Sequence, residues 1–146
     1  WHGAVFENSF LETALFIASM LFIGFLEEVI FRGFLFKALS RKSIRSATLI
    51  SSVTFGMGHI VNLLNGADFL PTLLQIGYAS AIGFLFTVLF IKTKSLWPGI
   101  IAHAFINATS LFAVEGNGSV QLVSSLVMVF ISVGYALYLS RVVTEN

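Results

Sequence analysis

The chain has 146 residues, of which 57% are hydrophobic and 10% are charged, and its mean hydropathy is +0.93. A soluble domain carries about a quarter charged residues, so this composition excludes an ordinary soluble protein and indicates a polytopic membrane protein. The absence of cysteine excludes disulfides and thiolate catalysis, and a net charge of +1 without a basic stripe gives no reason to expect a nucleic-acid partner.

The apolar runs predict an all-α fold, a polytopic transmembrane bundle of about five helices that contains an intramembrane cavity. Each run is too long and too unbroken for a strand. The runs cover residues 10–39, 47–64, 70–91, 96–114 and 120–143. We interpret residues 1–146 as a single intramembrane domain without an internal repeat. Because the first residue is tryptophan, we expect the sequence to be an excerpt that lacks N-terminal helices.

Basic residues alternate between successive loops. Residues 37–45 carry four of the eight Lys and Arg, residues 92–94 carry two more, and Arg141 follows the fifth run. The loops at 65–68 and 115–119 carry none. Under the positive-inside rule, the three basic segments face the cytoplasm and the other two loops face the opposite side of the membrane.

Small residues recur at four-residue spacing in the second and third runs, as Ser52 with Gly56 and Ala79 with Gly83. Such pairs allow helices to approach closely, although helices rich in alanine and glycine also produce them by chance. We interpret the serines of the membrane segments as residues that pack helices together; these are Ser51, Ser52, Ser110, Ser124 and Ser125.

Six polar side chains interrupt these apolar runs: Glu27, Glu28, Arg32, His59, His103 and Asn107. An Asp, Lys or Arg in the middle of a spanning helix costs about 2.5–3.5 kcal/mol on insertion scales, so such groups usually face a cavity and act there. At about 1.5 Å per residue, Glu27 lies about 15 Å from Lys37 and His103 about 14 Å from Lys94. The similar depths predict one shared cavity, open toward the cytoplasm.

Spacing within each helix separates the roles of these groups. Glu28 and Arg32 are four residues apart, in the order that favours a helical ion pair, so we interpret them as structural support. Glu27 lies about 100° around the helix from Glu28 and is left as the free carboxylate. Phe55 shares a face with His59, as His103 does with Asn107.

One acid, two imidazoles and one amide suit hydrolysis. A carboxylate in a low-dielectric site can take a proton from water, His59 can orient that water, and His103 with Asn107 can stabilise an oxyanion. As an alternative, Glu27, His59 and His103 could hold a Zn²⁺ ion. The same groups also occur in proton relays of transporters, and each alone is compatible with a structural role.

The motifs resemble those of the CPBP family, which contains the type II CAAX prenyl endopeptidases and the bacteriocin-processing and self-immunity proteins. The residues that carry the resemblance are EEVIFR at 27–32, FGMGH at 55–59 and HAFIN at 103–107, and the stretch SLWPGIIAH that leads into the third motif is similar too. The resemblance covers about residues 20–112. It implies a helical intramembrane bundle with a conical cavity open to the cytoplasm and laterally to lipid.

The resemblance also implies roles and partners. Glu27 would be the general base, with His59, His103 and Asn107 completing the catalytic set, and Glu28, Arg32 and Phe55 would support them. The substrate would be a membrane-associated peptide or protein, prenylated or not, and the enzyme a glutamate-type or metallo-endopeptidase. The alternative function is a non-catalytic bacteriocin immunity or membrane scaffold protein.

Overall fold

The computed structural model describes residues 8–112 and 117–142, and in these ranges the elements are all helical. The first rod consists of α1 (Phe10–Glu28), a π-helix (Val29–Phe36) and α2 (Lys37–Ser40) in direct succession. Ser9 begins it with a capping box, in which its hydroxyl accepts the Glu12 N–H and the Glu12 carboxylate accepts the Ser9 N–H at 2.8 Å. The rod agrees with the predicted run at 10–39.

The second rod consists of α3 (Ile44–Met57), a 3₁₀ turn (Gly58–Ile60) and α4 (Val61–Leu64). It is followed by α5 (Phe69–Thr93), which ends where Lys94 takes the left-handed conformation, with φ 57°, and donates its N–H to the Phe90 carbonyl. The fifth predicted run forms α7 (Gly118–Val142).

The fourth predicted run, at 96–114, is described up to residue 112, and its last two residues lie outside the described part of the chain. It forms α6 (Trp97–Thr109), with Pro98 in the first turn, and continues as a 3₁₀ turn (Ser110–Phe112). The Ser110 hydroxyl donates to the Asn107 carbonyl at 2.7 Å, so a side chain takes part of the bonding of the last helical turn. Among the described residues, four helices are long and apolar enough to cross a membrane, and α6 is not one of them.

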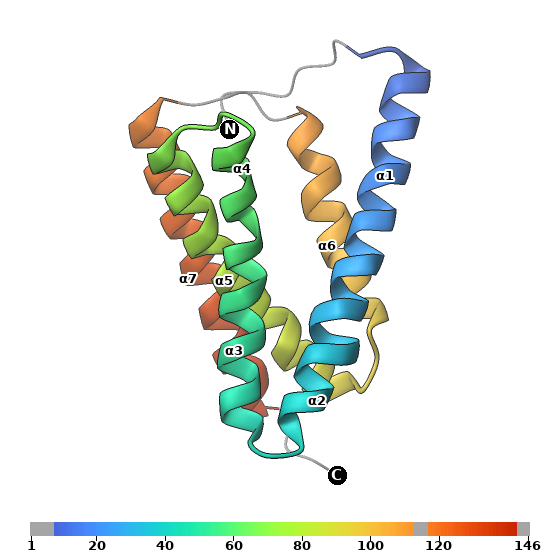
Figure 1. The fold of residues 1–146 in the computed structure, drawn as a ribbon, viewed down its shortest axis with the longest axis vertical. Coiled ribbons are helices and arrows are strands. Elements are labelled where there is room, and N and C mark those ends of the chain that lie inside the picture. Colours follow the sequence, from blue (N-terminus) through green and yellow to red (C-terminus); the bar gives the residue numbers. More distant parts are fainter. Residues whose placement is uncertain (1–7, 113–116, 143–146) are drawn as a thin grey trace.

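The helices form two groups that are joined near one end of the molecule (Figure 1). In one group α1 packs against α6, and in the other α5 packs against both α3 and α7. The π-helix and α2 contact α3, and a core of Phe36, Ala47 and Phe90 lies there beside the basic loops. The groups diverge toward the other end, where α6 ends and α7 begins.

Close contact between α3 and α5 depends on glycine. An added Cβ on Gly56 would lie 2.6 Å from the Ile76 carbonyl oxygen, and one on Gly83 would lie 3.1 Å from the Ser52 carbonyl oxygen. The small-residue pairs therefore do lie at a helix contact, and the chance interpretation is wrong for them. Ser51 also bridges helices, because its hydroxyl donates to the Phe31 carbonyl at 2.9 Å.

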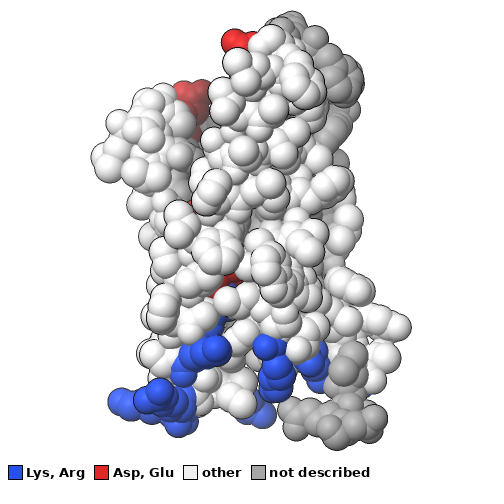
Figure 2. Space-filling model, turned by 90° about the vertical axis from the view of Figure 1, so that its right-hand side faces the viewer, with Lys and Arg blue, Asp and Glu red and all other residues white. Residues whose placement is uncertain are grey.

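The charged and apolar surfaces fit a membrane protein. Lys and Arg side chains gather at the end that carries the α2–α3 and α5–α6 connections (Figure 2). Large apolar side chains such as Phe22 on α1 and Phe130 on α7 point outward, with more than 70% of their surface exposed in the isolated chain. Hydrocarbon is the solvent in which such a surface is stable. The chain is thus an integral membrane protein.

Candidate active site

The two adjacent carboxylates have different surroundings. Glu28 Oε1 lies 2.7 Å from Arg32 Nη1, and the two side chains are 1% and 0% exposed. The predicted ion pair between them is confirmed. Glu27, the preceding residue, keeps 35% of its side chain exposed and lies outside this pair. A water molecule can therefore reach Glu27 but has almost no access to Glu28.

Arg32 is held on several sides by groups of α3 and α5. Its Nη2 donates to the Gly83 carbonyl oxygen at 2.8 Å, and its guanidinium carbon lies 4.5 Å from the ring centroid of Phe55 and 5.5 Å from that of Phe86. Aromatic faces and a carbonyl oxygen replace the water that the cation loses on burial. The first rod is thereby fixed to α5 at the depth of the carboxylates.

Gly99, in the first turn of α6, makes room for Glu28. A Cβ on Gly99 would lie 2.7 Å from Glu28 Oε2, so any larger residue would push the carboxylate from its place beside Arg32. Similarly, a Cβ on Gly24 would lie 3.1 Å from the Ala104 nitrogen, which shows how closely α1 and α6 approach. This close contact brings the third motif to the first.

His103 of α6 lies between the two carboxylates. Its Nε2 is 3.4 Å from Glu27 Oε2, and its Nδ1 is 3.5 Å from Glu28 Oε1. Neither approach makes a hydrogen bond in the described structure, and Nδ1 is a buried nitrogen without one. The Phe55 ring meets the imidazole edge-to-face at 5.3 Å, and the Phe86 ring lies at 5.7 Å. The imidazole is therefore enclosed, with one nitrogen directed at the accessible carboxylate.

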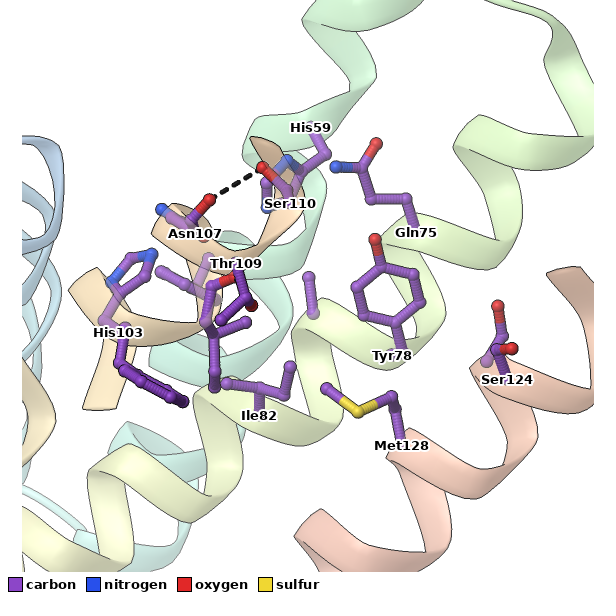
Figure 3. A pocket seen from close by; sticks show the side chains of 15 residues that line it. His59, Gln75, Tyr78, Ile82, His103, Asn107, Thr109, Ser110, Ser124 and Met128 are labelled. Carbon is purple, nitrogen blue, oxygen red and sulfur yellow. Dashed lines mark hydrogen bonds between the residues drawn. The ribbon is translucent and has the colours of Figure 1, made fainter. Parts of the chain in front are cut away.

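A cavity of about 490 Å³ connects the second and third motifs. His59, His103 and Asn107 all line it, and Phe55 lies between the two imidazoles, with its centroid 6.2 Å from that of His59. Figure 3 shows His103 and Asn107 together on one side of the cavity, with His59 near them. The described lining does not include Glu27, which approaches His103 from α1.

The cavity extends away from the basic loops. Its lining runs from His103 on α6 to Ser110 in the following 3₁₀ turn, and reaches Gln75 and Ser124 within the first two turns of α5 and α7. Those turns begin at the end opposite the Lys and Arg cluster. The position of this cavity thus differs from the cytoplasmic opening that the sequence predicts, and the side from which a substrate enters stays a prediction.

The alternative zinc set has no matching cluster. Within residues 8–112 and 117–142, no three side chains of His, Asp or Glu are grouped so that they could hold a metal ion. Glu27 and His103 are neighbours, but Phe55 stands between His103 and His59. These residues do not fit a three-ligand zinc site in this arrangement.

Several residues of the cavity give no distinct signal in the sequence. Gln75, Tyr78, Ser124 and Met128 form the wall that faces His103 and Asn107 (Figure 3). Uncharged polar residues are common in membrane helices, so their presence alone does not mark a site. Ser124, Ser125 and Ser110 line the cavity, in addition to the packing role expected of them.

Comparisons with known proteins agree with these motifs. The sequence model of the family described as "Type II CAAX prenyl endopeptidase Rce1-like" matches residues 9–109, more than half of the chain. The chain belongs to this Rce1-like family. The matched range contains all three motifs, from Glu27 to Asn107, and it ends before α7 begins.

A comparison with curated proteins found one relative. The protein described as "Putative membrane peptidase YdiL" from Bacillus subtilis (strain 168) is 39% identical over 94 residues, which are 64% of this chain and 34% of the relative. The Rce1-like chain therefore spans about a third of the length of this relative. No solved structure matches the chain.

Proposed function

We propose that the intact protein is an intramembrane endopeptidase that hydrolyses peptide bonds of membrane-associated substrates with a water molecule activated by Glu27. One observation carries the proposal. Of two adjacent carboxylates, Glu28 is buried against Arg32, whereas Glu27 is 35% exposed and faces His103 Nε2 at 3.4 Å. The description of the family as prenyl endopeptidases and that of the relative as a membrane peptidase support the reaction class.

The reaction needs one base that later acts as an acid. Glu27 takes a proton from water while the water oxygen attacks the carbonyl carbon of the substrate, which gives a tetrahedral oxyanion. The protonated Glu27 then gives that proton to the amide nitrogen, the C–N bond breaks, and a carboxylic acid and an amine leave. In a site shielded from bulk water, a carboxylate is a stronger base than in solution.

The neighbouring groups have complementary roles in this proposal. His103 and Asn107 donate hydrogen bonds to the oxyanion, because both lie on α6 and line the same part of the cavity. His59 orients the attacking water from the facing helix. Glu28 and Arg32 hold the π-helix against α5 and keep a carboxylate beside His103, which fixes the imidazole next to Glu27.

The substrate and its approach are part of the proposal. We place the basic end of the bundle in the cytoplasm, since the Lys and Arg side chains of the loops gather there. The substrate is a peptide segment at or within the bilayer, and the family description makes a prenylated cysteine near the cleaved bond one substrate class to test.

The test compares two glutamates of the same helix. The intact protein is expressed in its host as wild type, Glu27→Gln and Glu12→Gln, at equal levels. Peptide termini of the membrane proteome are then compared by mass spectrometry. We expect termini that are present with wild type and Glu12→Gln and absent with Glu27→Gln, because only Glu27 adjoins the polar motifs. Unchanged folding is checked by thermal unfolding of each purified protein.

One outcome would contradict the proposal, and two further experiments address the substrate and the metal. Identical termini in all three strains would contradict the proposal and favour the immunity or scaffold function. A purified peptide ending in a farnesylated Cys-aliphatic-aliphatic-X sequence, offered with its unprenylated counterpart, distinguishes the substrate classes. Elemental analysis of the purified wild type for zinc, together with activity in a chelator, tests the metal alternative directly.

A further inference from the structure

The wall of the cavity that faces the motifs carries two side-chain donors. Gln75 and Tyr78 lie on consecutive turns of α5, and both are half-buried and line the cavity with His59 and Asn107. In Figure 3 the Tyr78 hydroxyl points toward the Gln75 side chain, and the Gln75 amide nitrogen points toward His59. Neither the Tyr78 hydroxyl nor the Gln75 nitrogen donates a hydrogen bond within the described residues.

Asn62 sets the direction of the Gln75 amide. The Asn62 Nδ2 of α4 donates to Gln75 Oε1 at 2.8 Å. An amide has one acceptor oxygen and one nitrogen with two donors, so a donor on the oxygen side leaves the nitrogen directed the other way. Here the nitrogen is turned toward the cavity, on the side of His59 (Figure 3). The pair therefore presents a fixed donor rather than an amide free to rotate.

A peptide in this cavity would need such donors. Each backbone carbonyl that leaves water without a partner costs several kcal/mol, and a helical segment keeps its carbonyls bonded to itself. The backbone around a peptide bond must be extended, and its carbonyl must have no helical hydrogen bond, before water can attack the bond. Fixed N–H and O–H donors on the opposite wall would compensate the carbonyls next to the bond that is cleaved.

We propose that Gln75 and Tyr78 bind the backbone of an extended substrate segment, by donating hydrogen bonds to carbonyls that flank the cleaved bond, with Asn62 as a positioning residue. This proposal rests on the proposed peptidase function and adds the substrate-binding wall to it. Ile82 and Met128 lie below Tyr78 in Figure 3 and form an apolar floor, and Ala79 also lines the cavity. Such a floor suits an aliphatic substrate side chain rather than a charged one.

The first experiment measures substrate binding and turnover separately. The purified intact protein in detergent micelles is offered a peptide mixture prepared by trypsin from the host membrane fraction, and the best-cleaved peptide is resynthesised for kinetics. We expect Gln75→Met to raise KM roughly 2- to 10-fold with kcat nearly unchanged, as for the loss of one uncharged hydrogen bond. Tyr78→Phe has an effect of the same kind.

Two controls make the result specific. Gln121→Met makes the same change on α7 outside the cavity lining and leaves KM unchanged. Asn62→Leu raises KM in the wild-type protein but adds little in the Gln75→Met background, because both changes remove the same directed donor. Additive effects of Asn62→Leu and Gln75→Met would contradict the positioning role.

Failure of this inference can be told apart from failure of the peptidase function. Cleavage that survives Glu27→Gln would overturn the peptidase mechanism. Cleavage lost in Glu27→Gln, with the KM of Gln75→Met equal to that of the wild type, would overturn only the binding wall. A fluorescein-labelled form of the resynthesised peptide, bound to Glu27→Gln and to Glu27→Gln/Gln75→Met, gives the affinity ratio without turnover, and a ratio of one would overturn it as well.

The apolar floor has its own readout. Met128→Ala removes volume from the floor, and we expect the peptides cleaved from the mixture to shift toward larger aliphatic side chains near the new terminus. Met128 is half-buried and lines the cavity from α7. A cleavage pattern identical to that of the wild type would show that substrate side chains do not occupy this floor.

Discussion

Arg32 has no exposed side-chain surface, yet it carries a full charge. Three kinds of contact replace part of its hydration: the Glu28 carboxylate, the Gly83 carbonyl and the face of the Phe55 ring. Its buried Nε has no hydrogen-bond partner among the described residues. The contacts come from three helical segments, so the cation ties together the rods that hold the polar motifs. Its contribution is therefore to the assembly of the site, and Glu27 stays outside the ion pair.

Loss of Arg32 should destabilise the protein. Arg32→Met keeps much of the side-chain volume but leaves Glu28 buried and unpaired, and we expect a loss of about 3–5 kcal/mol in the free energy of unfolding. Unfolding of the purified protein in mixed micelles with increasing SDS measures it. Glu28→Leu/Arg32→Met removes both charges and should recover most of the loss. Equal stability of Arg32→Met and wild type would contradict the role of the pair.

At the scale of the element, the contact between α3 and α5 depends on a missing side chain. A Cβ on Gly56 would collide with the Ser80 hydroxyl and would lie 2.6 Å from the Ile76 carbonyl oxygen and 2.8 Å from the Ser80 nitrogen. Two of these three atoms belong to the backbone, which cannot turn away as a side chain can. The position of α3, and with it that of Phe55 and His59, follows from this glycine.

Gly56→Ala should therefore separate α3 from α5. We expect a loss of about 1–3 kcal/mol or more in the free energy of unfolding, as for overpacked cores. Gly77→Ala, on α5 with open space around the added carbon, should have almost no effect. Adding Ser80→Ala to Gly56→Ala removes the hydroxyl but leaves the backbone contacts, so it should restore little. A full recovery in the double variant would place the conflict at the hydroxyl alone.

The sequence predicts the helices and the ion pair well. A charge in a spanning helix costs free energy, so each one present indicates a partner or a cavity. Glu28 and Arg32 are recognisable by spacing, and the depth count brings His59, His103 and Asn107 to one cavity, as the structure does. Glu27, which the count places there too, is not part of the described cavity lining. The catalytic roles of these residues stay a prediction. The π-helix is not predictable from these residues, since nothing in the pattern VIFRGFLF distinguishes a π-turn from an α-turn.

Other features depend on contacts between distant residues. Gly99 leaves space for Glu28, and Asn62 donates a hydrogen bond to Gln75. Both contacts are between segments that no local sequence pattern relates. The Ser110 hydroxyl, which the sequence presents as one more packing serine, bonds to the Asn107 carbonyl where α6 gives way to a 3₁₀ turn. Such features arise from the way helices meet, and a single sequence carries no direct record of that.

At the scale of the whole molecule, charge and cavity lie toward opposite ends. The loops rich in Lys and Arg mark one end, and the cavity reaches Gln75 and Ser124 near the other. The positive-inside rule assigns the basic end to the cytoplasm. The two observations together predict that the cavity is reached from the side of the α4–α5 connection, in contrast to the opening expected from the motifs.

Cysteine labelling in intact cells tests this arrangement, because the chain contains no cysteine of its own. We expect a membrane-impermeant maleimide to modify Asn65→Cys in intact cells and Lys42→Cys only after permeabilisation. Ser124→Cys, which lines the cavity, should react like Asn65→Cys. Reversed reactivity of Asn65→Cys and Lys42→Cys would overturn the orientation. If Ser124→Cys, like Lys42→Cys, is labelled only after permeabilisation, the intact protein closes the cavity at the α4–α5 end and opens it to the cytoplasm. A cytoplasmic peptide could then enter beside Glu27.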